Sequence, residues 1–374
     1  MTIQTSKLFE SIAVGSLELK HRVVLAPLTR LRASAVGGIP AELSIDYYAQ
    51  RTSDGGLLFS EGTVVAEEAA CFPCAPGIYS PEQIEAWKKI NSAVHAKGGK
   101  IVCQLFAAGR STMPGVSSVV YAPSDIPLQG GYQKLIVMTE EDIERCVKHF
   151  AQAARNAIEA GFDGVEVHGA NGYLIDQFTQ LVSNKRTDSY AASTFLFPLR
   201  VTQAVVDAIG ADKVGYRISP FSRFQEMREV DPLGTFIPLV EKLLEAHPDL
   251  AFIHAVEPRT EGTGSVELAK ATDSLDPIRD IVKKKGKGTK FIVAGGYNAE
   301  DAKRHADETG DLVAFGRYFI SNPDLPTRIE HGWPLKTYER DTFYTPGPVG
   351  YTDYPYYSPL HQEESYTSGV PQVV

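Results

Sequence analysis

Residues 164–178 read GVEVHGANGYLIDQF, an apolar run that ends abruptly in a short polar turn. The run has the length and composition of a buried strand, and His168 closes it. Asn171 and Tyr173 follow within the same turn, so three hydrogen-bonding side chains gather at one strand end. Two donors for an oxygen and a nearby phenol suit a site that stabilises an enolate. A strand cap followed by a polar loop is the alternative interpretation.

Seven further apolar runs are similar to this one, and helical patterns stand between them. The runs are short, rich in Val, Ile and Leu, and show little alternation, as expected of strands covered on both faces. Strands that alternate with helices along residues 1–374 predict an α/β protein with one domain, a (β/α)8 TIM barrel. A doubly wound sheet is the alternative, but no GxGxxG follows the first run. The eight runs are 23–27, 56–62, 100–106, 164–169, 214–220, 251–258, 290–296 and 312–317.

Several of the intervening helices have recognisable first residues. Ser80 stands before Pro81 and Gln83, which is a capping box with proline at the first helical position. Thr139 and Asn298 each precede acidic residues and predict two further helix starts. A fourth helix is predicted from an apolar stripe within 236–244.

Three segments lie outside this alternation. A hairpin formed by Leu8–Phe9 and Leu17–Leu19 is predicted ahead of the first barrel strand. Segment 110–138, between the third run and its helix, is rich in Gly, Pro and Ser and predicts a cap inserted on the strand-exit face. The aromatic stretch 342–357 is expected to pack over that face, whereas 358–374 is expected to be a loose tail.

Charge and hydropathy exclude several classes of protein. A net charge of -9 and a pI near 5.6 argue against nucleic-acid binding. There is no run of 18 apolar residues and no signal-peptide core, so we expect a cytoplasmic protein without a membrane span. Cys71 and Cys74 have CxxC spacing but no second Cys or His pair, so we interpret them as incidental loop cysteines and expect no metal. Cys103 and Cys146 lie in apolar stretches and are assigned to the core.

The carboxyl ends of barrel strands are where active sites of TIM barrels lie. Paired glycines, Gly295-Gly296, end the seventh run, and Gly316-Arg317 end the eighth. Glycines allow backbone N–H groups to approach an anion closely, and a guanidinium adds charge, so the two ends predict a phosphate site. Read singly, the glycines also fit a simple turn. Other strand ends carry Thr29, Gly62, Gln104, Phe106 and Arg217; Arg217 alone also fits a role as partner of a buried carboxylate.

Three motifs resemble the Old Yellow Enzyme family of FMN-dependent NADPH dehydrogenases, or ene-reductases. They are 168–178, 315–325, and 341–344 together with 350–355, and the resemblance runs from about Leu8 to Tyr357 in the family's order. Thr29 and the His168/Asn171 pair are similar to the classical branch, with a fungal-like pattern. The resemblance implies a TIM barrel that holds FMN noncovalently.

The resemblance also implies a role for each candidate residue. His168 and Asn171 bind the substrate oxygen, and Tyr173 donates the proton. Tyr344 and Phe106 lie on the substrate side. The implied FMN-binding residues are Pro27, Leu28, Thr29, Gly62, Gln104, Arg217, Gly295, Gly296, Gly316 and Arg317.

The implied reaction is the reduction of the C=C bond of α,β-unsaturated carbonyl compounds, with NADPH or NADH as reductant. Phenols are expected to bind as inhibitors, and the protein is expected to be a monomer or a homodimer. One alternative is a dedicated biosynthetic reductase or isomerase of an unsaturated aldehyde, such as an alkaloid intermediate. Another is a flavin- or phenol-binding protein with low turnover.

Two positions depart from the family pattern. Phe106 stands where many members have tryptophan, which predicts a reshaped pocket with the same chemistry. Segment 190–198 is shorter than the corresponding family segment. We expect its helix to begin near Pro198, which suits a first helical position, and the residues before it to form a repacked or mobile loop.

Overall fold

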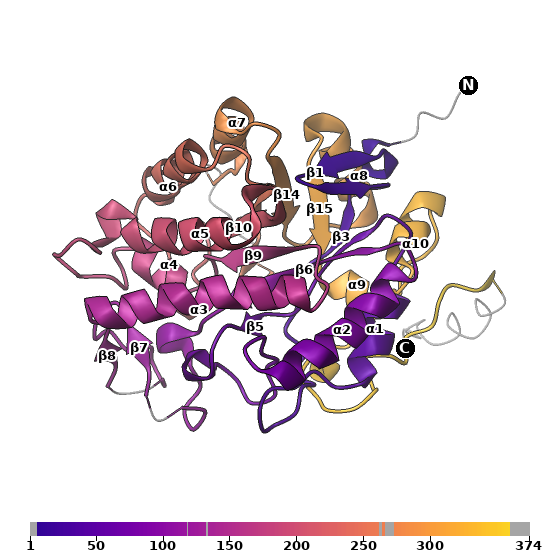
Figure 1. Ribbon diagram of the computed structural model, residues 1–374. Helices are drawn as coiled ribbons and strands as arrows, with labels where there is room; N and C mark the ends of the chain where they lie inside the picture. Colours follow the sequence, from indigo (N-terminus) through magenta and orange to yellow (C-terminus); the bar gives the residue numbers. More distant parts are fainter. Residues whose placement is uncertain (1–5, 118, 132–133, 262–263, 266–272, 360–374) are drawn as a thin grey trace, which may run out of the picture.

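The computed structural model describes residues 6–117, 119–131, 134–261, 264–265 and 273–359. Within them, eight parallel strands close into a barrel, because each strand pairs with the next, β4 pairs with β6, and β15 pairs back with β3 (Figure 1). All eight predicted runs form these strands, so the (β/α)8 prediction is confirmed and the doubly wound alternative is wrong. The strands are β3 (Val23–Leu25), β4 (Leu57–Phe59), β6 (Lys100–Phe106), β9 (Gly164–His168), β10 (Val214–Ile218), β11 (Phe252–Val256), β14 (Lys290–Ala294) and β15 (Leu312–Phe315).

The helices lie outside the barrel, and their first residues are those that the capping signals predicted. Ser80 Oγ accepts the N–H of Gln83, and the Gln83 side chain accepts the N–H of Ser80, which completes the capping box. Thr139 and Asn298 also accept N–H groups of the first turns of their helices. The helices are α1 (Leu43–Gln50), α2 (Pro81–His95), α3 (Glu140–Glu159), α4 (Leu174–Thr179), α5 (Leu196–Ile209), α6 (Pro232–Ala246), α7 (Asp276–Lys285), α8 (Ala299–Thr309), α9 (Arg317–Ser321) and α10 (Leu325–His331).

Each barrel strand is apolar on both faces because each face contacts a separate apolar layer. Inside the barrel, Val24, Phe59 and Phe252 pack in one cluster. Outside it, alternate residues such as Val165 and Val167 pack in the large cluster that includes the helices. Burial on both faces explains why the runs lack the alternation of half-exposed strands. No helix of the described residues is long and apolar enough to span a membrane.

The N-terminal hairpin consists of β1 (Ile12–Val14) and β2 (Leu17–Leu19). The prediction was right for the second strand but wrong for the first, because Leu8–Phe9 belongs to a 3-10 turn, Lys7–Phe9. Ser6 caps that turn by accepting the N–H of Leu8, so local hydrogen bonding outweighs strand pairing there. Hairpin side chains of both strands join the apolar cluster inside the barrel.

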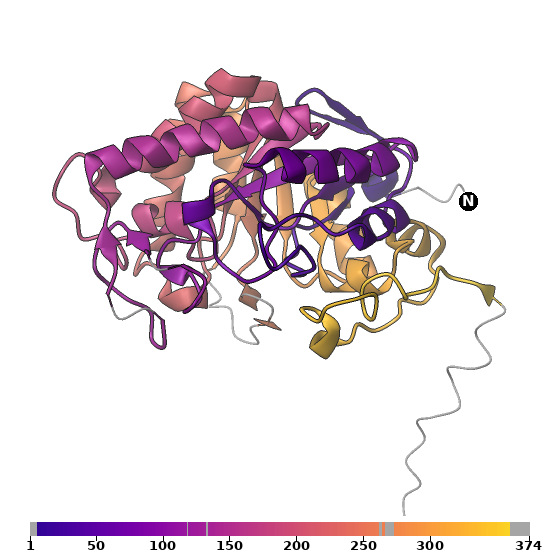
Figure 2. The ribbon, with the colours of Figure 1, turned by 60° about the horizontal axis from the view of Figure 1, so that its bottom comes forward.

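The cap segment and the C-terminal segment lie on the same side of the barrel (Figure 2). The cap includes a 3-10 turn (Gly109–Ser111) and a short parallel pair, β7 (Tyr121–Ala122) with β8 (Ile136–Val137). Residues 360–374, most of the expected loose tail, lie outside the described residues.

Three buried arginines, which the sequence did not single out, hold the C-terminal segment in place. Arg32 donates to the carbonyl oxygens of Phe343 and Gly347, each at 3.0 Å. Arg30 donates to Gly350 O at 2.7 Å, and Arg51 donates to carbonyl oxygens of α9 and of Tyr351. A guanidinium has five donors and no acceptor, so it suits a set of converging carbonyls. These contacts set the place of Phe343 and Tyr344.

The shortened segment folds close to the prediction, since its helix begins near Pro198, two residues earlier. Helix α5 begins at Leu196, two residues before Pro198, so Pro198 lies in its first turn, where the missing N–H has no intrahelical partner to lose. Phe195 precedes the helix in the left-handed conformation, with φ of 56°. The Phe197 ring is buried 4.1 Å from the Phe178 ring, and this contact provides a physical reason for the earlier start.

Candidate active site

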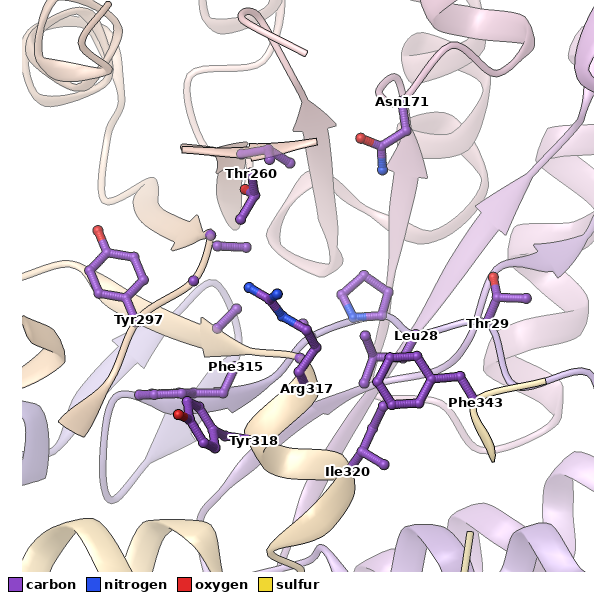
Figure 3. Close-up of a pocket in the computed structure, with 18 of the residues that line it drawn as sticks. Leu28, Thr29, Asn171, Thr260, Tyr297, Phe315, Arg317, Tyr318, Ile320 and Phe343 are labelled. Atoms are coloured by element: carbon purple, nitrogen blue, oxygen red, sulfur yellow. The ribbon is translucent and has the colours of Figure 1, made fainter. Parts of the chain in front are cut away.

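The carboxyl ends of six barrel strands, and the residues that follow them, surround a cavity of about 230 Å³. Figure 3 shows the Arg317 side chain pointing from the start of α9 toward the middle of the labelled residues, with Thr260 across from it. The sequence-predicted residues that line the cavity are Pro27, Leu28, Thr29, Asn171, Tyr173, Arg217, Gly295, Gly296, Gly316, Arg317 and Tyr344.

The turn after β9 presents its side chains because of its backbone conformation. Asn171 and Gly172 both have positive φ, at 58° and 75°. Asparagine and glycine are among the residues that adopt this region most readily. The N–H of Asn171 donates to Ser219 Oγ at 2.7 Å, and that of Gly172 donates to the buried Asp176 at 2.8 Å. The GANG sequence therefore encodes a tight turn that aims the Asn171 amide at the cavity.

His168, Tyr173 and Phe106 form an aromatic cluster beside the cavity. The Tyr173 ring lies 4.5 Å from Phe106 and 5.1 Å from His168, both edge to face. Burial lowers the pKa of His168 well below its usual range, and Arg217 adds to this effect, so the imidazole is neutral at pH 7. Burial raises the pKa of Tyr173, which keeps its proton. The cluster thus combines a neutral donor with a protonated phenol.

Two buried polar atoms next to the cavity lack partners among the described residues. They are Nδ1 of His168 and Nε of Arg217. Buried polar atoms in native proteins usually have partners, so these two atoms are available to a group that binds at the cavity. Arg217 is only 7% exposed, and its burial lowers the pKa of the guanidinium while Glu166 opposes the change.

The end of the cavity formed by β14 and β15 is lined by backbone. A Cβ on Gly295 would lie 2.6 Å from Glu257 Cβ, so only glycine fits there. Gly296 has φ of 64°, and a Cβ on it would lie 3.6 Å from Arg317 Nη2. The double glycine therefore places exposed backbone directly beside a guanidinium, which is the arrangement that an anion needs.

The remaining predicted residues, Gly62, Gln104, Phe106 and His168, do not line the cavity, although they lie close behind its wall. A Cβ on Gly62 would lie 3.5 Å from Gln104 Oε1 and 3.6 Å from the Phe106 ring. Through Phe106 and His168 this group contacts Tyr173, which does line the cavity. The structure thus brings all the predicted residues into one region, in two adjoining sets.

The sequence reasoning missed several lining residues. Tyr297, Tyr318 and Phe343 stand within or next to motifs that were recognised, so proximity to those motifs was the available signal. Thr260 and Phe224 lie on segments between a strand and its helix that carry no pattern. Only the folded chain brings these two to the cavity.

Glu61, at the end of β4, shapes the loop that carries Thr29. Its Oε2 accepts the N–H groups of Arg30 at 3.0 Å and Leu31 at 3.3 Å. Burial raises the pKa of Glu61 from 4.5 to about 7, although both hydrogen bonds oppose the change. The loop is therefore held by a carboxyl that resists ionisation.

We expect Glu61→Gln to gain stability relative to the wild type as the pH rises from about 4.5 to about 7. In this interval the carboxyl ionises in the unfolded chain but not in the folded one, so the wild type loses stability. Glutamine keeps the acceptor and does not titrate. Relative to the wild type, the free energy of unfolding of the variant rises by on the order of 3 kcal/mol over this interval, and the difference is constant above pH 7. Urea unfolding of both proteins across this range measures it; a difference that does not change with pH contradicts the assignment.

Comparisons with known proteins find relatives that match most of the chain. Residues 7–336 match the model of the NADH:flavin oxidoreductase / NADH oxidase family. A chanoclavine-I aldehyde reductase of Penicillium roqueforti is 45% identical over 369 residues, which cover 93% of this chain and 96% of the relative. The 12-oxophytodienoate reductase 7 of Oryza sativa subsp. japonica is 44% identical, with 93% and 94% covered. The solved structure of morphinone reductase superposes with a TM-score of 0.86 at 34% identity, covering 96% of this chain and 99% of that one.

Proposed function

The chain belongs to the NADH:flavin oxidoreductase / NADH oxidase family, as a protein of the Old Yellow Enzyme type, and from this premise we propose the roles of its site residues. It is an FMN-dependent oxidoreductase that uses NAD(P)H to reduce the C=C bond of α,β-unsaturated carbonyl compounds. The reductase relatives favour this activity over a flavin- or phenol-binding protein with low turnover. The proposed roles rest on one observation: the same cavity is lined by Asn171, Tyr173, Arg217 and Arg317.

The residues at the cavity fit FMN. Gly295, Gly296, Gly316 and Arg317 would hold the phosphate, since they combine close backbone with one guanidinium. Thr29 and Arg217 at the cavity, and Gln104 just behind its wall, would bind the ring, and the unpaired Nε of Arg217 is a donor available for it. Pro27, Leu28 and Gly62 would pack beside it. The chemistry that FMN supplies when bound is hydride transfer from NADPH or NADH to the β-carbon of the alkene.

His168 and Asn171 bind and polarise the carbonyl oxygen of the substrate. Donors preorganised at that oxygen stabilise the negative charge that develops on it as the enolate forms. A neutral imidazole and an amide donate without becoming ionised. Tyr173 then delivers its proton to the α-carbon. Because its pKa is raised, the phenol still carries this proton at neutral pH.

Aromatic side chains that line the cavity select the substrate. Phe343 and Tyr344, on the segment held by the buried arginines, and Phe224 line it, so a flat and largely apolar enone or enal is favoured. Phe106 packs against Tyr173 and shapes the wall behind that phenol. A phenolate resembles the enolate in having an oxygen anion on a planar group, so we infer that phenols inhibit. We place the enzyme in the cytoplasm, as a monomer or homodimer that uses NADPH or NADH.

Spectroscopy of the purified protein tests the proposed function. Protein reconstituted with FMN is expected to be yellow, to lose its visible absorption on anaerobic addition of NADPH, and to recover it on addition of cyclohexenone. A panel of enones and enals then ranks substrates. If the FMN is reduced by NADPH but reoxidised by none of the enones, the reductase activity is contradicted; if no FMN binds, the cofactor assignment itself fails.

A further inference from the structure

A buried polar chain crosses the inside of the barrel next to the candidate active site. Gln104 Nε2 donates to Glu166 Oε1 at 2.7 Å, and His254 Nδ1 lies 2.6 Å from Glu166 Oε2. Gln104 is 3% exposed, and Glu166 and His254 are 0% exposed. A carboxyl removed from water in this way requires partners on both oxygens, and here it has them.

Strand register explains why these three side chains meet. Gln104 on β6 is the direct partner of Glu166 on β9. On the other side of Glu166, strand β10 has Gly215 as the register partner and so puts no side chain there. His254, on β11 beyond that strand, reaches the second carboxylate oxygen.

The chemistry of the chain determines which way the Gln104 amide faces. A carboxylate has only acceptors, so the amide must turn its NH₂ group to Glu166. Burial lowers the pKa of His254, so its imidazole is neutral, and Nδ1 is then the nitrogen that carries the proton toward Glu166. The Gln104 carbonyl oxygen is left facing Gly62, where a Cβ would lie 3.5 Å from it.

We propose that Glu166 is a positioning residue that acts through Gln104. It holds the Gln104 amide so that the carbonyl oxygen, and not the NH₂ group, faces the isoalloxazine ring. The negative charge of Glu166 also offsets the positive charge of the neighbouring Arg217. The inference rests on the ring-binding roles proposed above for Gln104 and Arg217. An acceptor in that place recognises the ring through its N3–H, the N–H donor of the oxidised isoalloxazine. Arg217 would stabilise negative charge on a bound ring, and Glu166 would oppose it.

Binding of FMN and 3-methyl-FMN tests the orientation, because the methyl group removes the donor. Kd is measured on the apoprotein by quenching of flavin fluorescence, independently of turnover. The wild type is expected to prefer FMN by at least tenfold. Glu166→Leu releases the Gln104 amide, so the preference of this variant for FMN over 3-methyl-FMN is expected to be at least fivefold smaller than that of the wild type. Glu166→Gln is the matched control: its oxygen accepts from Gln104, and its N–H donates to His254 Nδ1 once the neutral imidazole carries its proton on Nε2, so the preference stays.

The outcomes separate the inference from the proposed function. A folded Glu166→Leu protein that keeps the full wild-type preference overturns the role of Glu166. A wild type that binds both flavins equally overturns the ring contact of Gln104, and the inference with it. Thermal unfolding of each variant shows whether a change reflects folding.

The reduction potential of bound FMN provides a second readout if Glu166→Leu does not fold. Glu166→Gln keeps the shape of the chain and removes its negative charge. The equilibrium ratio of reduced to oxidised FMN is then expected to rise at least tenfold. For a two-electron couple this corresponds to a reduction potential that is about 30 mV more positive. If the reduction potential of bound FMN does not change, the claim that the charge of Glu166 offsets that of Arg217 is overturned.

Discussion

Tyr173→Phe is expected to lower the rate of enone reduction by about 10²- to 10⁴-fold while leaving the reduction of bound FMN by NADPH nearly unchanged. Hydride transfer from a nicotinamide requires no acid, whereas reduction of an enone requires a proton at the α-carbon. Phenylalanine keeps the ring that packs edge to face against Phe106 at 4.5 Å and against His168, so the fold of the turn should be preserved.

Stopped-flow measurement of the two half-reactions under anaerobic conditions separates the two rates. A nitroalkene is a useful control substrate, since its anion persists in water after hydride transfer and depends less on the enzyme's acid. Loss of both half-reactions by the same factor would show that the phenol supports binding or folding and is not the proton donor. An unchanged rate with enones would assign the acid to another group.

Asn171→Gly should produce the second large effect, a loss of about 10²- to 10³-fold in enone reduction, or about 2.7–4 kcal/mol of transition-state stabilisation. The substitution removes one of the two donors to the substrate oxygen. Glycine is chosen because Asn171 has φ of 58°, where alanine would be strained. The N–H that Asn171 donates to Ser219 Oγ belongs to the backbone and is retained.

Asn171→Asp is the companion variant, since it keeps the shape and tolerates the same backbone conformation but turns a donor into an anion. It should reduce enones no faster than the glycine variant. Titration with a substituted phenol checks the same contact: a long-wavelength absorption band of phenolate with oxidised FMN is expected in the wild type and is expected to weaken in both variants. A band that persists unchanged in both would place the oxygen site elsewhere.

Much of the site was predictable because a parallel barrel gathers one end of every strand. Thr29, Arg217, Gly295 and Arg317 are far apart in the sequence, yet each follows or ends an apolar run, and all four line the same cavity. Some of the residues that were missed lie where no period or cap marks a position. Thr260 and Phe224 are examples, and both belong to connections between a barrel strand and the helix that follows it.

The sequence by itself determined the eight strands, most of the helix starts that were predicted and the positions of the strand-end residues, because these depend on local hydrogen bonding and on the burial of short apolar runs. Tertiary structure alone decided three other features: the start of α5 at Leu196, the anchoring of 342–351 by Arg30 and Arg32, and the orientation of the Gln104 amide. Each depends on a partner distant in the chain. The Phe178 ring, the carbonyl oxygens of the C-terminal segment and the carboxylate of Glu166 act only after folding has brought them within a few ångströms, and buried polar groups must then find partners among whatever the fold supplies.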